Sequence, residues 1–112
     1  MSQAPLPAYD RERLVELFGT DPRTLAEVER EFVATAREAE REIAATDDLA
    51  AIARAAHRLK GACGMIGAAT LRPIAEGVES AAKAENLLGV RRLHAAFSHE
   101  VKRVAEQAAL PD

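Results

Sequence analysis

The sequence is poor in cysteine and in aromatic residues. It contains one cysteine, Cys63, no tryptophan, and only 4% aromatic residues in total. A single cysteine excludes an internal disulfide, and it excludes a thiolate metal centre built from this chain alone. We therefore expect a fold held together by closely packed small aliphatic side chains rather than by cross-links, metal ions or large anchors.

Long apolar runs are also missing. No segment approaches the roughly 18 apolar residues of a membrane span, and the first residues, MSQAPLPAYD, have neither the basic start nor the apolar core of a signal peptide. We expect a cytoplasmic protein with no membrane partner. Lys+Arg 15 against Asp+Glu 18 gives a net charge of −3 without a basic block, which argues against nucleic acid as a partner.

Alanine is the most abundant residue. The chain has 25 alanines and 11 leucines among 112 residues, and 48% of its residues are hydrophobic. This composition favours helix over sheet and suffices for a core. We predict a single all-α domain over residues 1–112, in which residues 1–9 form an extended tail.

Capping residues, prolines and glycines divide the chain into five predicted helices. They are a short helix between Asp10 and Gly19, a second over residues 22–45, a third from a cap at Thr46 or Asp47 to Gly67, a fourth from near Thr70, and a fifth from Asn86 to a stop at Pro111. Short connections make neighbouring helices antiparallel. The prediction is an up-down four-helix bundle with the additional short N-terminal helix across one end.

The third predicted helix has the most regular apolar stripe. Its members recur at steps of three and four residues: Leu49, Ile52, Ala56, Leu59, Cys63 and Ile66. His57 lies roughly 130° from the mean direction of this stripe at about 100° per residue. We therefore expect His57 to face solvent and Cys63 to be a small core residue.

The residues that share the face of His57 are small or basic. They are Ala50, Ala53, Arg54, Lys60, Gly61 and Gly64. Each glycine inside a helix costs roughly 1 kcal/mol relative to alanine, and an outward direction removes core packing as the reason for it. We interpret this face as one that leaves room for a partner macromolecule to reach His57, with Lys60 as a positive charge one turn away.

The same residues form a recognisable pattern. The run from His57 to Ala68, HRLKGACGMIGA, resembles the signature of histidine-containing phosphotransfer (HPt) domains, in which His-x-Leu-Lys-Gly is followed after five residues by Gly-Ala. Further positions that fall where such domains have similar residues are Phe32, Asp48, Ala56, Leu71, Val78 and Glu79. Pro73 and Gly77 are less typical of these domains.

The resemblance implies a four-helix bundle that carries a phosphoryl group on His57 between the aspartates of response-regulator receiver domains. It also suggests the edge of the first helix near Leu14 and Phe18 as a further docking surface. Imidazole offers a nitrogen lone pair to phosphorus near neutral pH, and Lys60, with Arg54 or Arg58, supplies positive charge. The chain lacks a nucleotide-binding loop and a carboxylate cluster for Mg²⁺, so we expect a monomeric phosphocarrier that is not an enzyme and whose receiver partner supplies the metal.

Three other interpretations are open. A chemotaxis-type histidine kinase that phosphorylates the protein directly in trans is an alternative phosphoryl donor, although Gly67-Ala68 fits the phosphorelay type better. A hybrid histidine kinase is among the partners that the phosphorelay interpretation implies. A helical adaptor without phosphorylation would leave Lys60 and Gly61 without a purpose, and a plain structural or dimerisation bundle would leave the outward glycines unexplained.

The other histidines, His94 and His99, are five residues apart and diverge by about 140°, so we predict no metal site there.

Overall fold

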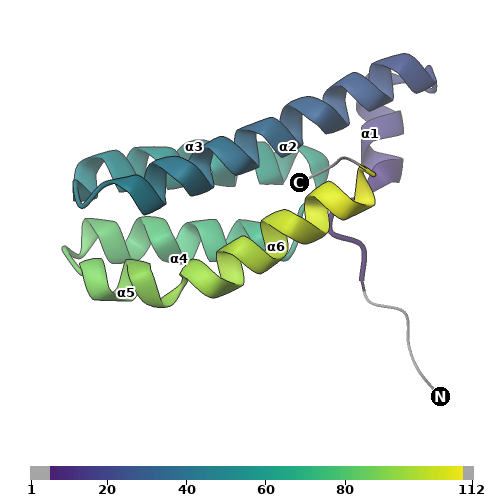
Figure 1. Cartoon of the computed structure of the whole chain (residues 1–112). Coiled ribbons are helices and arrows are strands. Elements are labelled where there is room, and N and C mark those ends of the chain that lie inside the picture. The colour runs from purple at the N-terminus through teal and green to yellow at the C-terminus, as the bar shows by residue number, and fades with distance from the viewer. Residues whose placement is uncertain (1–5, 110–112) are drawn as a thin grey trace.

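A computed structural model describes residues 6–109 of the chain, and within that range every regular element is a helix. The helices are α1 (Arg11–Phe18), α2 (Pro22–Ala45), α3 (Leu49–Ile66), α4 (Leu71–Lys83), α5 (Leu87–Arg92) and α6 (His94–Gln107). Figure 1 shows α2, α3, α4 and the α5–α6 pair running side by side, with α1 crosswise at one end. The predicted all-α bundle with a short N-terminal helix is confirmed.

The ends of the first three helices follow from local chemistry. The Asp10 side chain accepts hydrogen bonds from the N–H groups at the start of α1, and Asp21 does the same for α2 with Pro22 in its first turn. Gly67 ends α3 in the left-handed region at φ 68°, where glycine is favoured. The predicted cap of α3 at Thr46 or Asp47 is wrong by one or two residues, because the Asp48 side chain accepts from the first free N–H groups of the helix.

The fifth predicted helix is interrupted. Leu93 separates α5 from α6, and its N–H donates to the Val90 carbonyl three residues back. Gly77 of α4 lies opposite this break, since a Cβ atom at Gly77 would be 3.3 Å from Leu93 Cδ1. The absence of a side chain at Gly77 therefore permits the close approach of Leu93. The predicted stop at Pro111 lies outside the described residues.

The core contains the predicted apolar stripes. Its buried side chains include Phe32 and Ile43 of α2, Leu59 of α3, Val78 of α4 and Phe97 of α6. Many of the remaining core residues are alanines, which let the helices approach closely. Within residues 6–109, no helix has both the length and the apolar character needed to cross a membrane.

The segment before α1 is packed against the bundle. The sequence assigned Ala8 and Tyr9 to the tail, but both are buried, and the Tyr9 ring meets Phe32 edge-on at a centroid distance of 6.3 Å. The Tyr9 hydroxyl donates to the Glu29 carboxylate. Gln107 accepts from the Ala8 N–H and donates to the Tyr9 carbonyl at 2.9 Å. These contacts fix the first described residues beside the end of α6.

Candidate functional site

The histidine of the candidate site projects from the middle of α3. The apolar stripe of α3 faces the core, with Ala56 and Leu59 fully buried on either side of His57 in sequence. In the folded protein, 66% of the His57 side chain is exposed to solvent. Its direction agrees with the one predicted from the helical spacing, and the imidazole is accessible to another macromolecule.

One carboxylate gathers the polar groups around this histidine. Glu79 of α4 is buried, with 5% of its side chain exposed, and His57 Nδ1 lies 2.8 Å from its Oε2 atom. Lys60 Nζ lies 2.7 Å from the other oxygen, Oε1, and Lys83 Nζ lies 3.0 Å from Oε2. Glu79 thus links α4 to α3 through the His57 ring nitrogen and the Lys60 ammonium, while Lys83 pairs with it from within α4.

The electrostatics of this cluster decide which His57 nitrogen is free. The hydrogen bonds from Lys60, Lys83 and His57 outweigh burial and lower the pKa of Glu79 to about 2, so this carboxylate only accepts hydrogen bonds at neutral pH. The Nδ1 atom of His57 must then carry the proton that it shares with Glu79. In the neutral ring, the lone pair is consequently on Nε2.

Lys60 was expected on a solvent-facing surface, one helical turn from the imidazole. In the structure, Lys60 is less exposed than expected. Only 24% of its side chain is exposed, and its ammonium is paired with Glu79. The pairing holds the charge one helical turn from His57. Arg58, which the sequence offered as another cation, turns away toward α2 and pairs with Glu42 at 2.8 Å.

The predicted access surface on α3 is assembled as expected from the helical spacing. Ala50, Arg54, Gly61 and Gly64 are exposed, and Ala53 is half-buried. A Cβ atom added to Gly61 would meet nothing within 4 Å, so neither core packing nor a neighbouring helix requires glycine there. Beside His57 lies an open hollow of about 380 Å³, which is lined by Ala53, Arg54, His57, Arg58, Glu79 and Lys83.

The docking surface suggested on the first helix needs correction. Leu14 is 0% exposed and belongs to the core, so it cannot contact a partner. Phe18 is exposed to 38%, and the neighbouring Leu17 to 52%. Because α1 crosses the end of the bundle, its inner edge with Leu14 is covered, whereas Leu17 and Phe18 remain partly exposed.

The site lacks the features of a metal centre. Among residues 6–109, no group of three or more His, Cys, Asp or Glu side chains has the arrangement needed to hold a metal ion. His94 and His99 are both exposed on α6. Cys63 is buried, and desolvation raises the pKa of its thiol to about 12, which keeps it protonated and unreactive at neutral pH.

Sequence reasoning missed Glu79 as a member of the site. Its position was noted only as one that resembles other family members, and its contacts were not predicted. The available signal was an acidic residue next to the apolar stripe of α4, directly after the buried Val78. An acid at the edge of a buried stripe needs a cation or a proton donor nearby.

An exposed histidine with a buried carboxylate behind it, on an antiparallel helical bundle, defines a class of histidine-bearing bundle proteins. Residues 14–107, which are most of the chain, match the Hpt domain, and the chain therefore belongs to the Hpt domain family. No curated protein and no solved structure gave a match.

Membership establishes the general activity. Hpt domains carry out histidine phosphotransfer in the phosphorelays of two-component signalling, as phosphocarriers rather than enzymes. They interact with receiver domains and with histidine kinases.

Proposed function

We propose that His57 is the phosphorylated residue, and that it accepts a phosphoryl group from the aspartate of one receiver domain and passes it to the aspartate of another. The single observation that carries this proposal is the His57 Nδ1 to Glu79 contact of 2.8 Å on an otherwise exposed ring. The contact leaves Nε2 as the nucleophile and points it away from the bundle.

The transfer step requires no group beyond those of the two proteins. The Nε2 lone pair forms a bond to phosphorus while the bond from phosphorus to the aspartate oxygen breaks, and the aspartate leaves as a carboxylate. The His57 ring becomes an N-phosphorylated imidazolium that keeps its proton on Nδ1, from which it donates a hydrogen bond to Glu79. The negative charge of Glu79 stabilises this cationic ring, and the reverse sequence returns the phosphoryl group to a second receiver.

Lys60 and the receiver share the neutralisation of phosphoryl charge. The Lys60 ammonium is held one turn from His57 by Glu79, close enough to stabilise oxygens on the transferring group. In this proposal, Mg²⁺ enters with the acidic pocket of the receiver. This chain provides the nucleophile, the fixed tautomer and an open approach over Gly61.

The test is to replace His57 with Gln and incubate wild type and variant with phosphorylated receiver domains. Wild type should gain one phosphoryl group by mass, and the product should hydrolyse in acid and persist in base, as a phosphoramidate does. The variant should gain none. Helix content by circular dichroism must match between the two proteins, which the 66% exposure of His57 makes the expected result.

Three outcomes would overturn the proposal. Persistent labelling of a well-folded His57→Gln protein would place the phosphoryl group elsewhere. Complete failure of wild type to accept a group from any receiver, together with labelling by a histidine kinase in trans, would favour the chemotaxis-type alternative. Binding without any labelling would favour the adaptor.

A further inference from the structure

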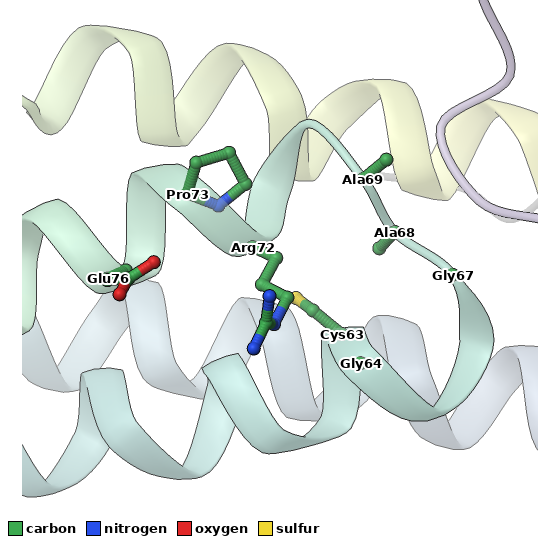
Figure 2. A pocket seen from close by; sticks show the side chains of 8 residues that line it. All are labelled: Cys63, Gly64, Gly67, Ala68, Ala69, Arg72, Pro73 and Glu76. Carbon is green, nitrogen blue, oxygen red and sulfur yellow. The ribbon is translucent and has the colours of Figure 1, made fainter.

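An open depression lies further along the α3–α4 surface that contains His57. Its volume is about 590 Å³, and its walls come from the last turns of α3, the connecting residues 67–69 and the first turns of α4. Figure 2 shows the Arg72 side chain extending from α4 toward α3 within this depression, beside Cys63 and Gly64. Glu76, one turn further along α4, lines the same depression.

Arg72 has no ionic partner among the residues that the structure describes. The other arginines of the bundle include several that are paired, such as Arg58 with Glu42, Arg91 with Asp47 and Arg103 with Glu100. The Arg72 side chain makes no hydrogen bond and no ion pair within residues 6–109, even with Glu76 one turn away. The exposed guanidinium of Arg72 in this depression can therefore donate hydrogen bonds to a carboxylate of another molecule.

Gly64 of α3 lies beside this arginine. A Cβ atom at Gly64 would lie 3.8 Å from Arg72 Nε, which is ordinary contact distance, so the placement of Arg72 does not itself require glycine here. Gly64 is exposed in the last turns of α3, and the Arg72 side chain is therefore accessible from this side.

The position of Arg72 relative to His57 follows from the helix register. His57 is opposite Glu79, and seven residues later Gly64 is opposite Arg72, seven residues earlier on the antiparallel helix. Seven residues correspond to about 10.5 Å along a helix. A standard interface covers about 800 Å² on each partner, so a protein centred on His57 would extend over Gly64 and Arg72.

We propose that Arg72 is a docking residue that binds a carboxylate side chain on the surface of the receiver domain, beside the receiver's phosphoacceptor pocket. This inference rests on the function proposed above. The guanidinium fork matches a carboxylate with two parallel hydrogen bonds, and Gly64 leaves the approach open. Glu76 repels a carboxylate at the other edge of the depression, so the pair of opposite charges favours one position for the incoming acid.

Arg72 should affect the binding of the receiver and not the phosphoryl transfer step itself. Arg72 lies on α4, two turns along that helix from Glu79, and forms no hydrogen bond or ion pair with Glu79 or Lys60. Its replacement should therefore leave the reactivity of the imidazole unchanged. The contact should instead contribute to the encounter and to the stability of the complex, as charges around an interface do. The affected quantity is the receiver concentration that gives half the maximal transfer rate.

The experiment measures transfer from a phosphorylated receiver domain to wild type, Arg72→Glu and Lys102→Glu at increasing receiver concentrations. Lys102 is exposed on α6 and gives the matched control, because its replacement changes the net charge equally. Arg72→Glu should raise the half-saturating concentration about tenfold, with the maximal rate kept, and Lys102→Glu should not. Arg72→Lys should fall between wild type and Arg72→Glu, because an ammonium cannot form the paired contact.

A second measurement uses phosphoramidate as a small phosphoryl donor, which needs no docking surface. Wild type and Arg72→Glu should be labelled on His57 at equal rates. Slower labelling of the variant would show that Arg72 acts on the imidazole, and it would overturn the proposal. Equal half-saturating concentrations for Arg72→Glu, Lys102→Glu and wild type would also overturn it.

These outcomes distinguish the two proposals. A wild-type protein that accepts no phosphoryl group from receivers contradicts the proposed function, and with it this inference. A wild-type protein that transfers normally while Arg72→Glu behaves like Lys102→Glu contradicts the inference alone. Restoration of docking in Arg72→Glu by reversing one receiver carboxylate to lysine would identify the partner residue.

Discussion

His57 and Glu79 are joined across the α3–α4 interface by a contact of 2.8 Å between Nδ1 and Oε2. One partner is exposed and the other is almost fully buried. The exposed ring thereby gains a fixed orientation from a group that solvent does not reach. The same carboxylate also holds Lys60, so a change at Glu79 affects two functional side chains together.

Replacing Glu79 with Gln should slow phosphotransfer by about 10- to 100-fold, the range typical when a group that orients a reactive side chain is removed. The amide preserves shape but lacks the charge that stabilises the phosphorylated ring. Rapid-quench transfer rates from a saturating receiver would measure the effect. Glu76→Gln, an exposed change on the same helix, should retain the wild-type rate at saturation.

Glu79→Gln should also change how the free energy of unfolding depends on pH. Because three partners lower the folded-state pKa of Glu79 from 4.5 to about 2, its ionisation stabilises the fold above pH 4.5, and this stabilisation is lost as the pH falls toward 2. Urea unfolding at several pH values should show wild type more stable than Glu79→Gln at pH 7, with a gap that narrows below pH 4.5. A gap that stays constant down to pH 2 would contradict the charge-based explanation.

Lys60→Ala should slow transfer or shorten the phosphohistidine lifetime by about ten- to a hundredfold, or roughly 1 to 3 kcal/mol, without abolishing transfer. Water and salt weaken the interaction of a partly exposed ammonium with the phosphoryl group. Lys60→Arg should recover part of the loss. An alanine variant with the wild-type rate and lifetime would assign Lys60 to positioning Glu79 or to solubility.

Gly61→Leu should block transfer between proteins while the fold is kept. The position is open, with nothing within 4 Å of an added Cβ atom, and leucine forms helix better than glycine by about 1 kcal/mol. Gly61→Ala is the matched control and should transfer normally with a higher melting temperature. Unchanged transfer by Gly61→Leu would show that the glycine does not provide access.

Leu14→Ala should destabilise the fold by about 2 to 5 kcal/mol, because the side chain is completely buried and its removal leaves a cavity. Leu17→Ala, on the same helix but 52% exposed, should change stability by about 0.5 kcal/mol or less. Urea denaturation distinguishes the two. If Leu14→Ala were stable but bound receivers weakly, the residue would belong to a docking surface after all.

The sequence was sufficient for most of the fold because helix ends and apolar stripes are local properties. Asp10, Gly19 and Gly67 marked helix ends that the structure confirms, and the direction of His57 followed from its angle to the stripe of α3. The interruption at Leu93 could not be predicted this way. Leu93 at this break lies close to Gly77 of α4, a contact between helices that the pattern of one helix does not reveal.

The site was only half predictable for the same reason. His57, Lys60 and Gly61 lie on one helix, so their relative placement follows from helical periodicity. Glu79 lies 22 residues from His57, and its contact depends on the register between two helices, which the turn over residues 67–70 sets. Leu14 was misassigned because an isolated apolar helix does not reveal which of its edges the bundle will cover.

The hydrogen bonds between Gln107 and residues 8 and 9 give the chain a nearly cyclic course. Segments 98 and 99 residues apart in sequence are direct neighbours at one end of the bundle. A short linker joining them would preserve the order of helix contacts, and new ends could be opened in the exposed turn 84–86 between α4 and α5. Such a circular permutant would keep the His57–Glu79 pair, since neither residue lies at the joined or the opened position.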